Sequence, residues 1–398
     1  MGSASCADAT LHSSRAFAAI KQPLVTSANA KEGIAIMCSL QVRHCLVATL
    51  CVLSPLFCAA QEPAVSNEVS YVSFQVPGAL GTYPASINSA NTVTGDYVAP
   101  TGDQPAFVRR FDGAITTFTV PGSGQTTPSA INDAGEIAGS YVISPDGGPQ
   151  LCFLRARDGS ITTFTPAASS GTAVVTGINE RGTVVGYYTD DTSTSSTYGF
   201  IRHRDGVVET IAVEGSAKTR IAGINAAGDV TGWYLNGSYI SGYVRSAQGR
   251  VTTFDLGTAL LPTSINDAGT ITGYYLVPVS LDDNWNHEFI RSPDGDMTTF
   301  TPPGTIWPGF LGINDEGTIA GNYQLPPSAS NPAVYFAFDR RRDGEITTIA
   351  PESGWQTMTT GINRAGVITG YYYNAAGPGA FAFLRIPARC SRRLSTPD

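Results

Sequence analysis

The sequence predicts an all-β protein, a seven-bladed β-propeller built from four-stranded antiparallel blades. Three observations support this fold class: 43 glycines and 25 prolines among 398 residues, a charged fraction of only 14%, and one motif that recurs every 41 to 49 residues. Abundant turn formers with few charges exclude a helical bundle and a disordered chain. A repeat of about 40–50 residues in a strand-type sequence is typical of propeller blades.

The recurring motif reads Ile-Asn-x-x-Gly-x-(Ile/Val)-x-Gly-x-Tyr. We interpret its Asn and Gly as the turn between the first two strands of a blade. Phe-x-Arg then marks the third strand, and an Asp-Gly hairpin leads to a fourth strand ending in Thr-Thr-Phe. Small residues directly before Ile-Asn suit an innermost strand, where blades crowd together. Six copies begin at Ile131, Ile178, Ile224, Ile265, Ile313 and Ile362, and a weaker one at Ile87, where Asn91 replaces the first glycine.

The phase of the repeat predicts how the ring closes. The last copy ends at Phe383-Leu384-Arg385 with no fourth strand, whereas Tyr71 to Gly78 matches Thr116 to Gly122. We therefore expect the N-terminal strand to complete the seventh blade, which removes exposed sheet edges.

The N-terminal segment predicts export. Arg43 and His44 precede an apolar run from Cys45 to Phe57 and small residues at Cys58-Ala59-Ala60, which is the pattern of a secretory signal peptide. We expect an extracellular or periplasmic protein with no membrane span after cleavage. The expected organisation is a non-native or unstructured leader (1–36), with Met37 as initiator, a signal peptide (37–60), a linker (61–68), the propeller (69–386) and a disordered basic tail (387–398). After cleavage only Cys152 and Cys390 remain, too few for a disulfide framework.

The repeat resembles the HAF-type repeat of bacterial extracellular proteins over all seven units, residues 69–386. The resemblance implies secretion and a propeller-like ring, but no catalytic residues. The His-Ala-Phe element of that family is replaced here, for example by Ala-Phe-Val-Arg at Ala106 to Arg109 and Gly-Phe-Ile-Arg at Gly199 to Arg202. No role of that histidine is therefore carried over.

Composition and motifs also exclude several functions. With three lysines and a formal charge of −8, phosphate-driven nucleic-acid binding is not expected. No metal or cofactor motif is present, so we expect neither a metal nor a cofactor, and we expect a monomer. Residues present in every blade, namely the Asn of Ile-Asn, the Arg of Phe-x-Arg and the Tyr of Gly-x-Tyr, are interpreted as scaffold.

Irregular residues are the better site candidates, and the loops that vary in length gather at one end of the blades. We call this end the variable-loop face: it carries the second-to-third connections and the connections between blades. Aromatic faces beside carboxylates suit sugar rings there. The predicted ligand-binding residues are Trp285, Trp307, Trp355, Asp282, Asp283 and His287.

The leading hypothesis is a secreted, non-catalytic propeller that binds a carbohydrate or an extracellular protein on this face. The same tryptophans would serve a purely structural purpose if they pack beneath long loops. One alternative is a glycoside hydrolase or lyase acting on extracellular polysaccharide, with a carboxylate pair drawn from Asp190, Asp191, Asp282, Asp283 and Glu288. Another is a structural or assembly platform.

Overall fold

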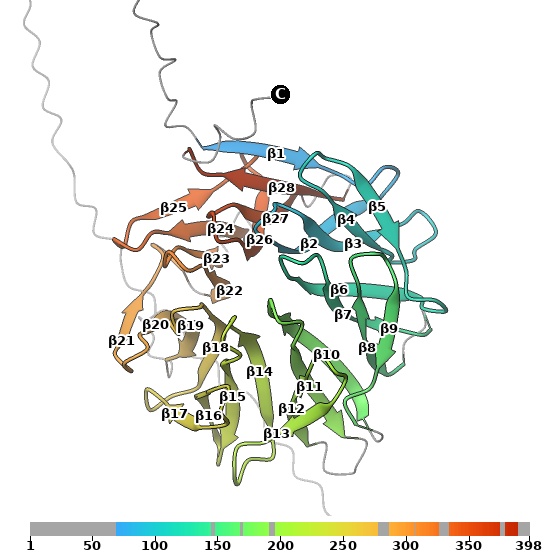
Figure 1. Cartoon of the computed structure of the whole chain (residues 1–398). Coiled ribbons are helices and arrows are strands. Elements are labelled where there is room, and N and C mark those ends of the chain that lie inside the picture. Colours follow the sequence, from blue (N-terminus) through green and yellow to red (C-terminus); the bar gives the residue numbers. More distant parts are fainter. Residues whose placement is uncertain are drawn as a thin grey trace, which may run out of the picture. The chain divides into compact units, whose positions relative to one another are not determined.

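Seven four-stranded antiparallel sheets form a closed ring around a central axis (Figure 1). The structure is a computed structural model and describes residues 69–144, 148–167, 170–190, 196–277, 286–305, 307–325, 334–374 and 379–388. All 28 elements within these ranges are strands. The predicted seven-bladed propeller is confirmed.

Each blade is a simple meander whose first strand lies nearest the axis. Blade 1 contains β2 (Gly81–Ile87), β3 (Val93–Val98), β4 (Ala106–Arg109) and β5 (Ile115–Phe118); blade 2 contains β6 (Gln125–Ile131), β7 (Ile137–Val142), β8 (Gln150–Arg155) and β9 (Ile161–Phe164); blade 3 contains β10 (Ser170–Ile178), β11 (Val184–Asp190), β12 (Thr197–Arg202) and β13 (Val208–Ile211); blade 4 contains β14 (Thr219–Ile224), β15 (Val230–Asn236), β16 (Tyr239–Arg245) and β17 (Val251–Phe254).

The later blades follow the same order. Blade 5 contains β18 (Leu260–Ile265), β19 (Ile271–Leu276), β20 (Asn286–Arg291) and β21 (Met297–Phe300); blade 6 contains β22 (Trp307–Ile313), β23 (Ile319–Leu325), β24 (Val334–Arg340) and β25 (Ile346–Ile349); blade 7 contains β26 (Gln356–Ile362), β27 (Ile368–Tyr373), β28 (Ala380–Ile386) and β1 (Ser70–Phe74).

The N-terminal strand closes the ring as predicted. Strand β1 pairs antiparallel with β28, from Ser70 opposite Ile386 to Phe74 opposite Ala382. The Tyr372 hydroxyl donates a hydrogen bond of 3.0 Å to the Ser73 hydroxyl across the same sheet. The first and last strands of the propeller therefore share one blade.

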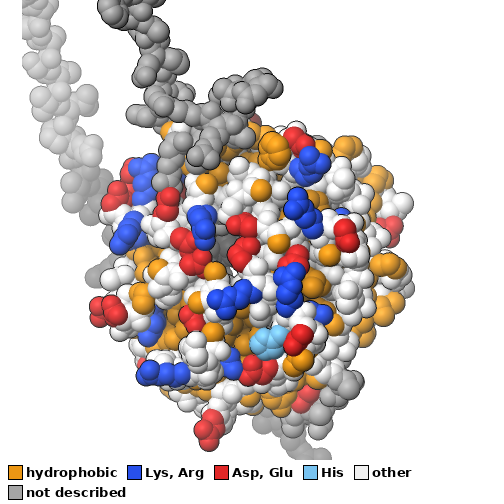
Figure 2. Space-filling view, viewed as in Figure 1, with side chains coloured by type: hydrophobic (Ala, Val, Ile, Leu, Met, Phe, Trp, Pro, Cys, Tyr) orange, Lys and Arg blue, Asp and Glu red, His pale blue; other side chains and the backbone are white. Residues whose placement is uncertain are grey.

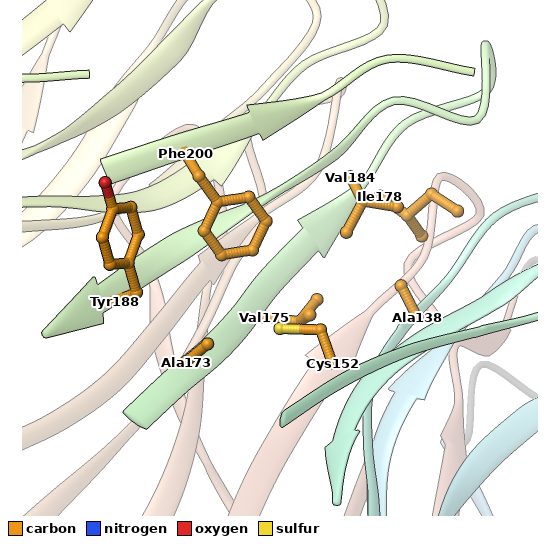
Figure 3. Close-up of a cluster of buried hydrophobic side chains, with 8 residues drawn as sticks. All are labelled: Ala138, Cys152, Ala173, Val175, Ile178, Val184, Tyr188 and Phe200. Carbon is orange, nitrogen blue, oxygen red and sulfur yellow. The ribbon is translucent and has the colours of Figure 1, made fainter. Parts of the chain in front are cut away.

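The hydrophobic core lies in the wedges between neighbouring blades. Figure 3 shows one wedge, in which Cys152 and Ala138 of blade 2 face Ala173, Val175 and Phe200 of blade 3. The aromatic residue of each Phe-x-Arg unit (tyrosine in blade 4) is fully buried in such a wedge: Phe107, Phe153, Phe200, Tyr243, Phe289, Phe338 and Phe383. Each wedge needs both of its blades, so stability depends on the whole ring.

The second glycine of the repeat motif is required by close backbone approach. A Cβ built on Gly232 in β15 would lie 1.9 Å from the carbonyl oxygen of Arg220 on β14. The pairing of β14 with β15 shifts register between Ile221 and Gly223. This irregularity brings the inner strand onto the glycine, and only a residue without a side chain fits.

The arginine of Phe-x-Arg joins neighbouring blades through aromatic stacking. In five blades its guanidinium carbon lies 4.7–4.9 Å from the centre of the phenylalanine ring that ends the outer strand of the preceding blade. The same arginines donate from Nη1 to the carbonyl of the following residue at 3.1–3.5 Å. The carbonyl bonds and the stacking on a ring both support the interpretation of these arginines as scaffold. The pairs are Arg109 with Phe74, Arg155 with Phe118, Arg202 with Phe164, Arg291 with Phe254 and Arg340 with Phe300.

Two outer strands end in isoleucine, and there the arginine of the next blade has a carboxylate partner. Where Ile211 replaces phenylalanine, Arg245 Nη2 lies 2.6 Å from Glu209 Oε1. Where Ile349 replaces it, Arg385 Nη2 lies 2.9 Å from Asp339, and both side chains are buried. A carboxylate thus substitutes for the missing ring in holding the arginine.

Candidate functional site: the ends of the central channel

A ring of seven asparagines surrounds one end of the channel. Each Oδ1 accepts a hydrogen bond from the backbone N–H four residues later, which is the predicted turn. Each Nδ2 also donates to the backbone carbonyl of the equivalent asparagine in the next blade, at 3.0–3.3 Å. The sequence did not predict these bonds between blades. Together they form a closed circle, because Asn363 donates to the carbonyl of Asn88. The asparagines are scaffold.

Acidic side chains line the rim outside this ring, where Figure 2 shows the central hollow. The hollow has a volume of about 180 Å³. Its carboxylates are already engaged: Asp133 and Asp267 accept backbone N–H groups of the preceding blades at 2.7 and 2.8 Å. Arg364 bridges Asp267 and Asp315 at 3.0 and 2.9 Å. These contacts join neighbouring blades, and they occupy the carboxylates that a ligand at this end would need.

The middle of the channel is lined mostly by small side chains and isoleucines. Its cavity of about 220 Å³ is lined by the small residues before Ile-Asn, such as Ser86, Ala130 and Gly223, and by the isoleucines themselves. Small side chains allow the inner strands to approach closely, as the sequence predicted.

The other end of the channel, at the variable-loop face, carries non-recurring side chains. Two positions face each other across the first two strands of a blade: the residue four before the isoleucine and the central residue of Gly-x-Tyr. Their register pairs include Tyr83 with Asp96, Val174 with Tyr187, Arg220 with Trp233, Leu261 with Tyr274 and Met358 with Tyr371. All of these side chains are half-buried. They therefore combine a fixed position with partial access to solvent.

A tyrosine cluster lies at this end of the channel, where blades 7 and 1 meet. The rings of Tyr83 and Tyr371 are 5.1 Å apart, edge to face, and Tyr371 stacks on Tyr373 at 6.1 Å. The Tyr373 hydroxyl donates to Gln356 Oε1 at 3.3 Å. Burial raises the pKa of Asp96 to about 7. Burial, with smaller contributions from Tyr373, Tyr83 and Asp96, also raises the pKa of Tyr371.

The structure describes two of the six predicted site residues with their side chains and a third by its backbone alone. Trp355 packs against Tyr372 and Phe381, with ring centres 5.6 and 6.0 Å apart, at the edge of the core. His287 stacks on Tyr275 at 5.4 Å, and its Nδ1 lies 2.6 Å from the Thr301 hydroxyl. Trp307 is described by its backbone alone. The remaining three, Asp282, Asp283 and Trp285, lie outside the described residues.

Three placements predicted from the sequence are wrong. His287 and Glu288 were expected in a connecting loop but lie in β20, and Trp307 was expected in a loop but begins β22. The reason is that the ladders extend beyond the recurring motifs: Leu276 pairs with Asn286 in blade 5, and Trp307 pairs with Gln324 in blade 6.

The carboxylates of the enzyme alternative are not brought together in the described part of the chain. Glu288 is fully buried in β20, and neither of its oxygens has a hydrogen-bond partner there. Asp190 accepts the Ser196 N–H at 2.9 Å and so closes its own loop. Asp191, like Asp282 and Asp283, falls outside the described residues. Glu288 therefore cannot contact a substrate.

Glu288 is expected to make stability fall as pH rises. Burial raises its pKa from 4.5 to about 8, so the folded protein holds a proton that the unfolded chain has released between those values. Glu288→Gln removes this titration. The variant should exceed the unfolding free energy of the wild type by no more than about 1 kcal/mol at pH 5 and by about 4 kcal/mol above pH 8.

Urea unfolding at pH 5, 7 and 9 measures this difference. The exposed Glu352 supplies the control substitution Glu352→Gln, for which no such pH-dependent gain is expected. A stability difference between Glu288→Gln and wild type that stays constant from pH 5 to 9 would contradict the prediction.

The channel-end residues were not predicted, because every residue predicted for the site was placed in a loop. Tyr83, Tyr187, Arg220, Trp233 and Tyr371 lie within strands. The available signal was variation inside the motif: the central residue of Gly-x-Tyr is in turn Asp, Ser, Tyr, Trp, Tyr, Asn and Tyr around the ring. A scaffold position would show one residue type, so this position was a site candidate.

The described residues contain no group of three or more His, Cys, Asp or Glu side chains that could hold a metal ion. No described helix has the length and apolar character to cross a membrane.

Comparison with known proteins shows the fold alone. No protein-family model matches the sequence, and no curated protein is significantly similar to it. Among solved structures, it is similar to the β-propeller domain of the Trilobed protease from Pyrococcus furiosus (TM-score 0.53, 12% identity, 77% of this chain and 94% of that one). It is also similar to oligogalacturonate lyase from Vibrio parahaemolyticus (TM-score 0.51, 9% identity, 80% and 97%).

A third similar structure is acylaminoacyl peptidase from Pyrococcus horikoshii (TM-score 0.50, 10% identity). The match covers 78% of this chain and 52% of the peptidase, so it spans about half of the peptidase's length.

Proposed function

We propose that this chain is an exported, non-catalytic propeller that binds a carbohydrate at the variable-loop face. Export is supported by the signal-peptide pattern of residues 37–60. An extracellular protein is the other ligand class expected for this face. The tyrosine cluster favours a sugar, because aromatic faces stack on its C–H groups while nearby polar groups bond its hydroxyls.

The observation that carries the proposal is the half-buried cluster of Tyr83, Tyr371 and Tyr373 beside Asp96 and Gln356. These rings are held by one another at 5.1 and 6.1 Å, so little side-chain freedom remains to be lost on binding. They stand at positions that change from blade to blade, whereas the recurring residues are occupied in holding blades together. A rigid, asymmetric set of aromatic and polar groups is what a small-molecule site requires.

A glycan array with purified protein tests this proposal. Wild-type protein should retain at least one glycan, and Tyr371→Ala should bind it about tenfold more weakly, as expected for loss of a central aromatic contact. Trp285→Ala tests the loop anchor predicted from the sequence in the same assay.

Phe111→Ala is the matched control, because Phe111 is 62% exposed and lies beside the Asp112-Gly113 hairpin at the opposite end of blade 1. This variant should bind like the wild type. Absence of any retained glycan would reject the carbohydrate ligand, and retention that is unchanged in Tyr371→Ala would reject this part of the face.

A further inference from the structure

Arg220 is held between two aromatic rings at the variable-loop end of the channel. Its guanidinium carbon lies 4.2 Å from the ring centre of Tyr187 on β11 and 5.0 Å from that of Trp233 on β15. Stacking on aromatic faces attracts the cation and fixes the plane of its planar fork. The cation is therefore positioned before any ligand arrives.

The hydrogen-bonding capacity of Arg220 is unused within the described chain. Its Nε is buried without a partner, the side chain as a whole is half-buried, and no described carboxylate lies within ion-pair distance. The stacked arginines of the Phe-x-Arg units differ, because each also donates to a backbone carbonyl. Arg220 alone among these stacked arginines keeps its Nη groups, which reach solvent, without an acceptor.

The scaffold does not need this arginine. The equivalent position, four residues before the isoleucine, is uncharged in every other blade: Tyr83, Thr127, Val174, Leu261, Gly309 and Met358. Because the guanidinium of Arg220 is stacked on Tyr187 and Trp233, it loses part of its hydration. An unpaired cation that is partly desolvated interacts more strongly with an anion than one in bulk water.

We propose that Arg220 binds the carboxylate of an acidic sugar, so that the ligand of this face is a uronate-containing saccharide. The guanidinium fork matches a carboxylate in a bidentate arrangement, approached in the plane between the two rings. Tyr187 and Trp233 orient the fork and offer ring edges to the sugar. This inference rests on the proposed carbohydrate function and names the substrate class.

The test compares two probes that share one sugar backbone and differ in whether its carboxyl groups are free or methylated. Trigalacturonic acid carries three carboxylates, and its methyl ester carries none. We expect wild-type protein to bind the acid at least tenfold more tightly than the ester in calorimetry at moderate salt. Arg220→Gln should weaken binding of the acid about 10- to 100-fold and leave binding of the ester unchanged.

Two further variants separate a carboxylate site from simple charge or structure. Arg220→Lys keeps a cation but loses the fork, and should retain only part of the preference for the acid. Arg250→Gln removes an exposed arginine from a hairpin at the other end of the blade. This variant should retain the full preference for the acid over the ester. Should Arg220→Gln fail to fold, quenching of tryptophan fluorescence in wild-type protein by glucuronate, and not by glucose, gives the same information.

The outcomes distinguish this inference from the function on which it rests. Equal affinity of wild-type protein for the acid and the ester overturns the uronate assignment and leaves carbohydrate binding standing. Failure to bind galacturonate, guluronate and glucuronate oligosaccharides, with neutral glycans retained on the array, overturns it as well. Failure to bind any glycan overturns both.

Discussion

Gly232→Ala is expected to destabilise the protein by about 4 kcal/mol or more, and to leave little folded protein at 37 °C. The added methyl group would lie 1.9 Å from the Arg220 carbonyl oxygen and 2.9 Å from its carbonyl carbon. Both are backbone atoms of a paired strand, so relief requires moving β14 away from β15. Overpacking that no rotamer change can relieve belongs to the most destabilising class of substitutions.

Gly223→Ala in the same blade is the matched control. A Cβ there would have its nearest neighbours at 3.6 Å, which is ordinary contact, and the equivalent residues Ser86, Ala130 and Ser264 already carry a side chain. Its unfolding free energy should change by no more than about 0.5 kcal/mol. Thermal and urea unfolding compare the two variants, and equal losses would show that close approach at Gly232 is not the cause.

Asp339→Val is expected to lower the unfolding free energy by about 3–5 kcal/mol. Asp339 and Arg385 are both buried and lie 2.9 Å apart, one on blade 6 and one on blade 7. Burial raises the pKa of Asp339, and the guanidinium of Arg385 opposes that rise. Removing the carboxylate leaves a buried cation without its partner, whereas valine itself fits, because Val108 and Val244 occupy the equivalent position.

A second substitution tests whether a ring can replace the carboxylate. Ile349→Phe restores the outer-strand residue on which the equivalent arginines stack in five blades. In the Asp339→Val background it should recover about 2 kcal/mol, although alone it should cost about 1–3 kcal/mol by overpacking. A double-mutant cycle in urea gives the coupling. If Ile349→Phe has the same effect in both backgrounds, ring and carboxylate are not interchangeable partners.

The fold could be predicted because the same local signals recur in every blade. Asn at the turn, Gly where strands touch and Asp-Gly at the hairpin each specify a local conformation, and seven repetitions removed the ambiguity of any single copy. The pairing of β1 with β28 followed from the missing fourth strand after Arg385. The partners of the Phe-x-Arg arginines were less evident, because the ring lies 35 to 40 residues upstream, in the preceding blade.

The candidate site was only partly predictable. Non-recurring residues were predicted as the candidates, but only those in loops were named. Whether Trp355 faces solvent or Tyr372 depends on wedge packing, which has no local signature. The sandwich of Arg220 between Tyr187 and Trp233 joins side chains 33 and 13 residues away in sequence, and only the arrangement of the blades around the axis brings them together.

The pairing of Ser70 with Ile386 also governs when the protein can finish folding. During translation at about 5–20 residues per second, β1 emerges roughly 15–60 s before the strand that will hold it. Until then the nascent blades form an open arc with an unpaired edge at each end. A polypeptide that stops a dozen residues short of Ile386 is left in that state, and its two free edges are the surfaces on which aggregation would begin.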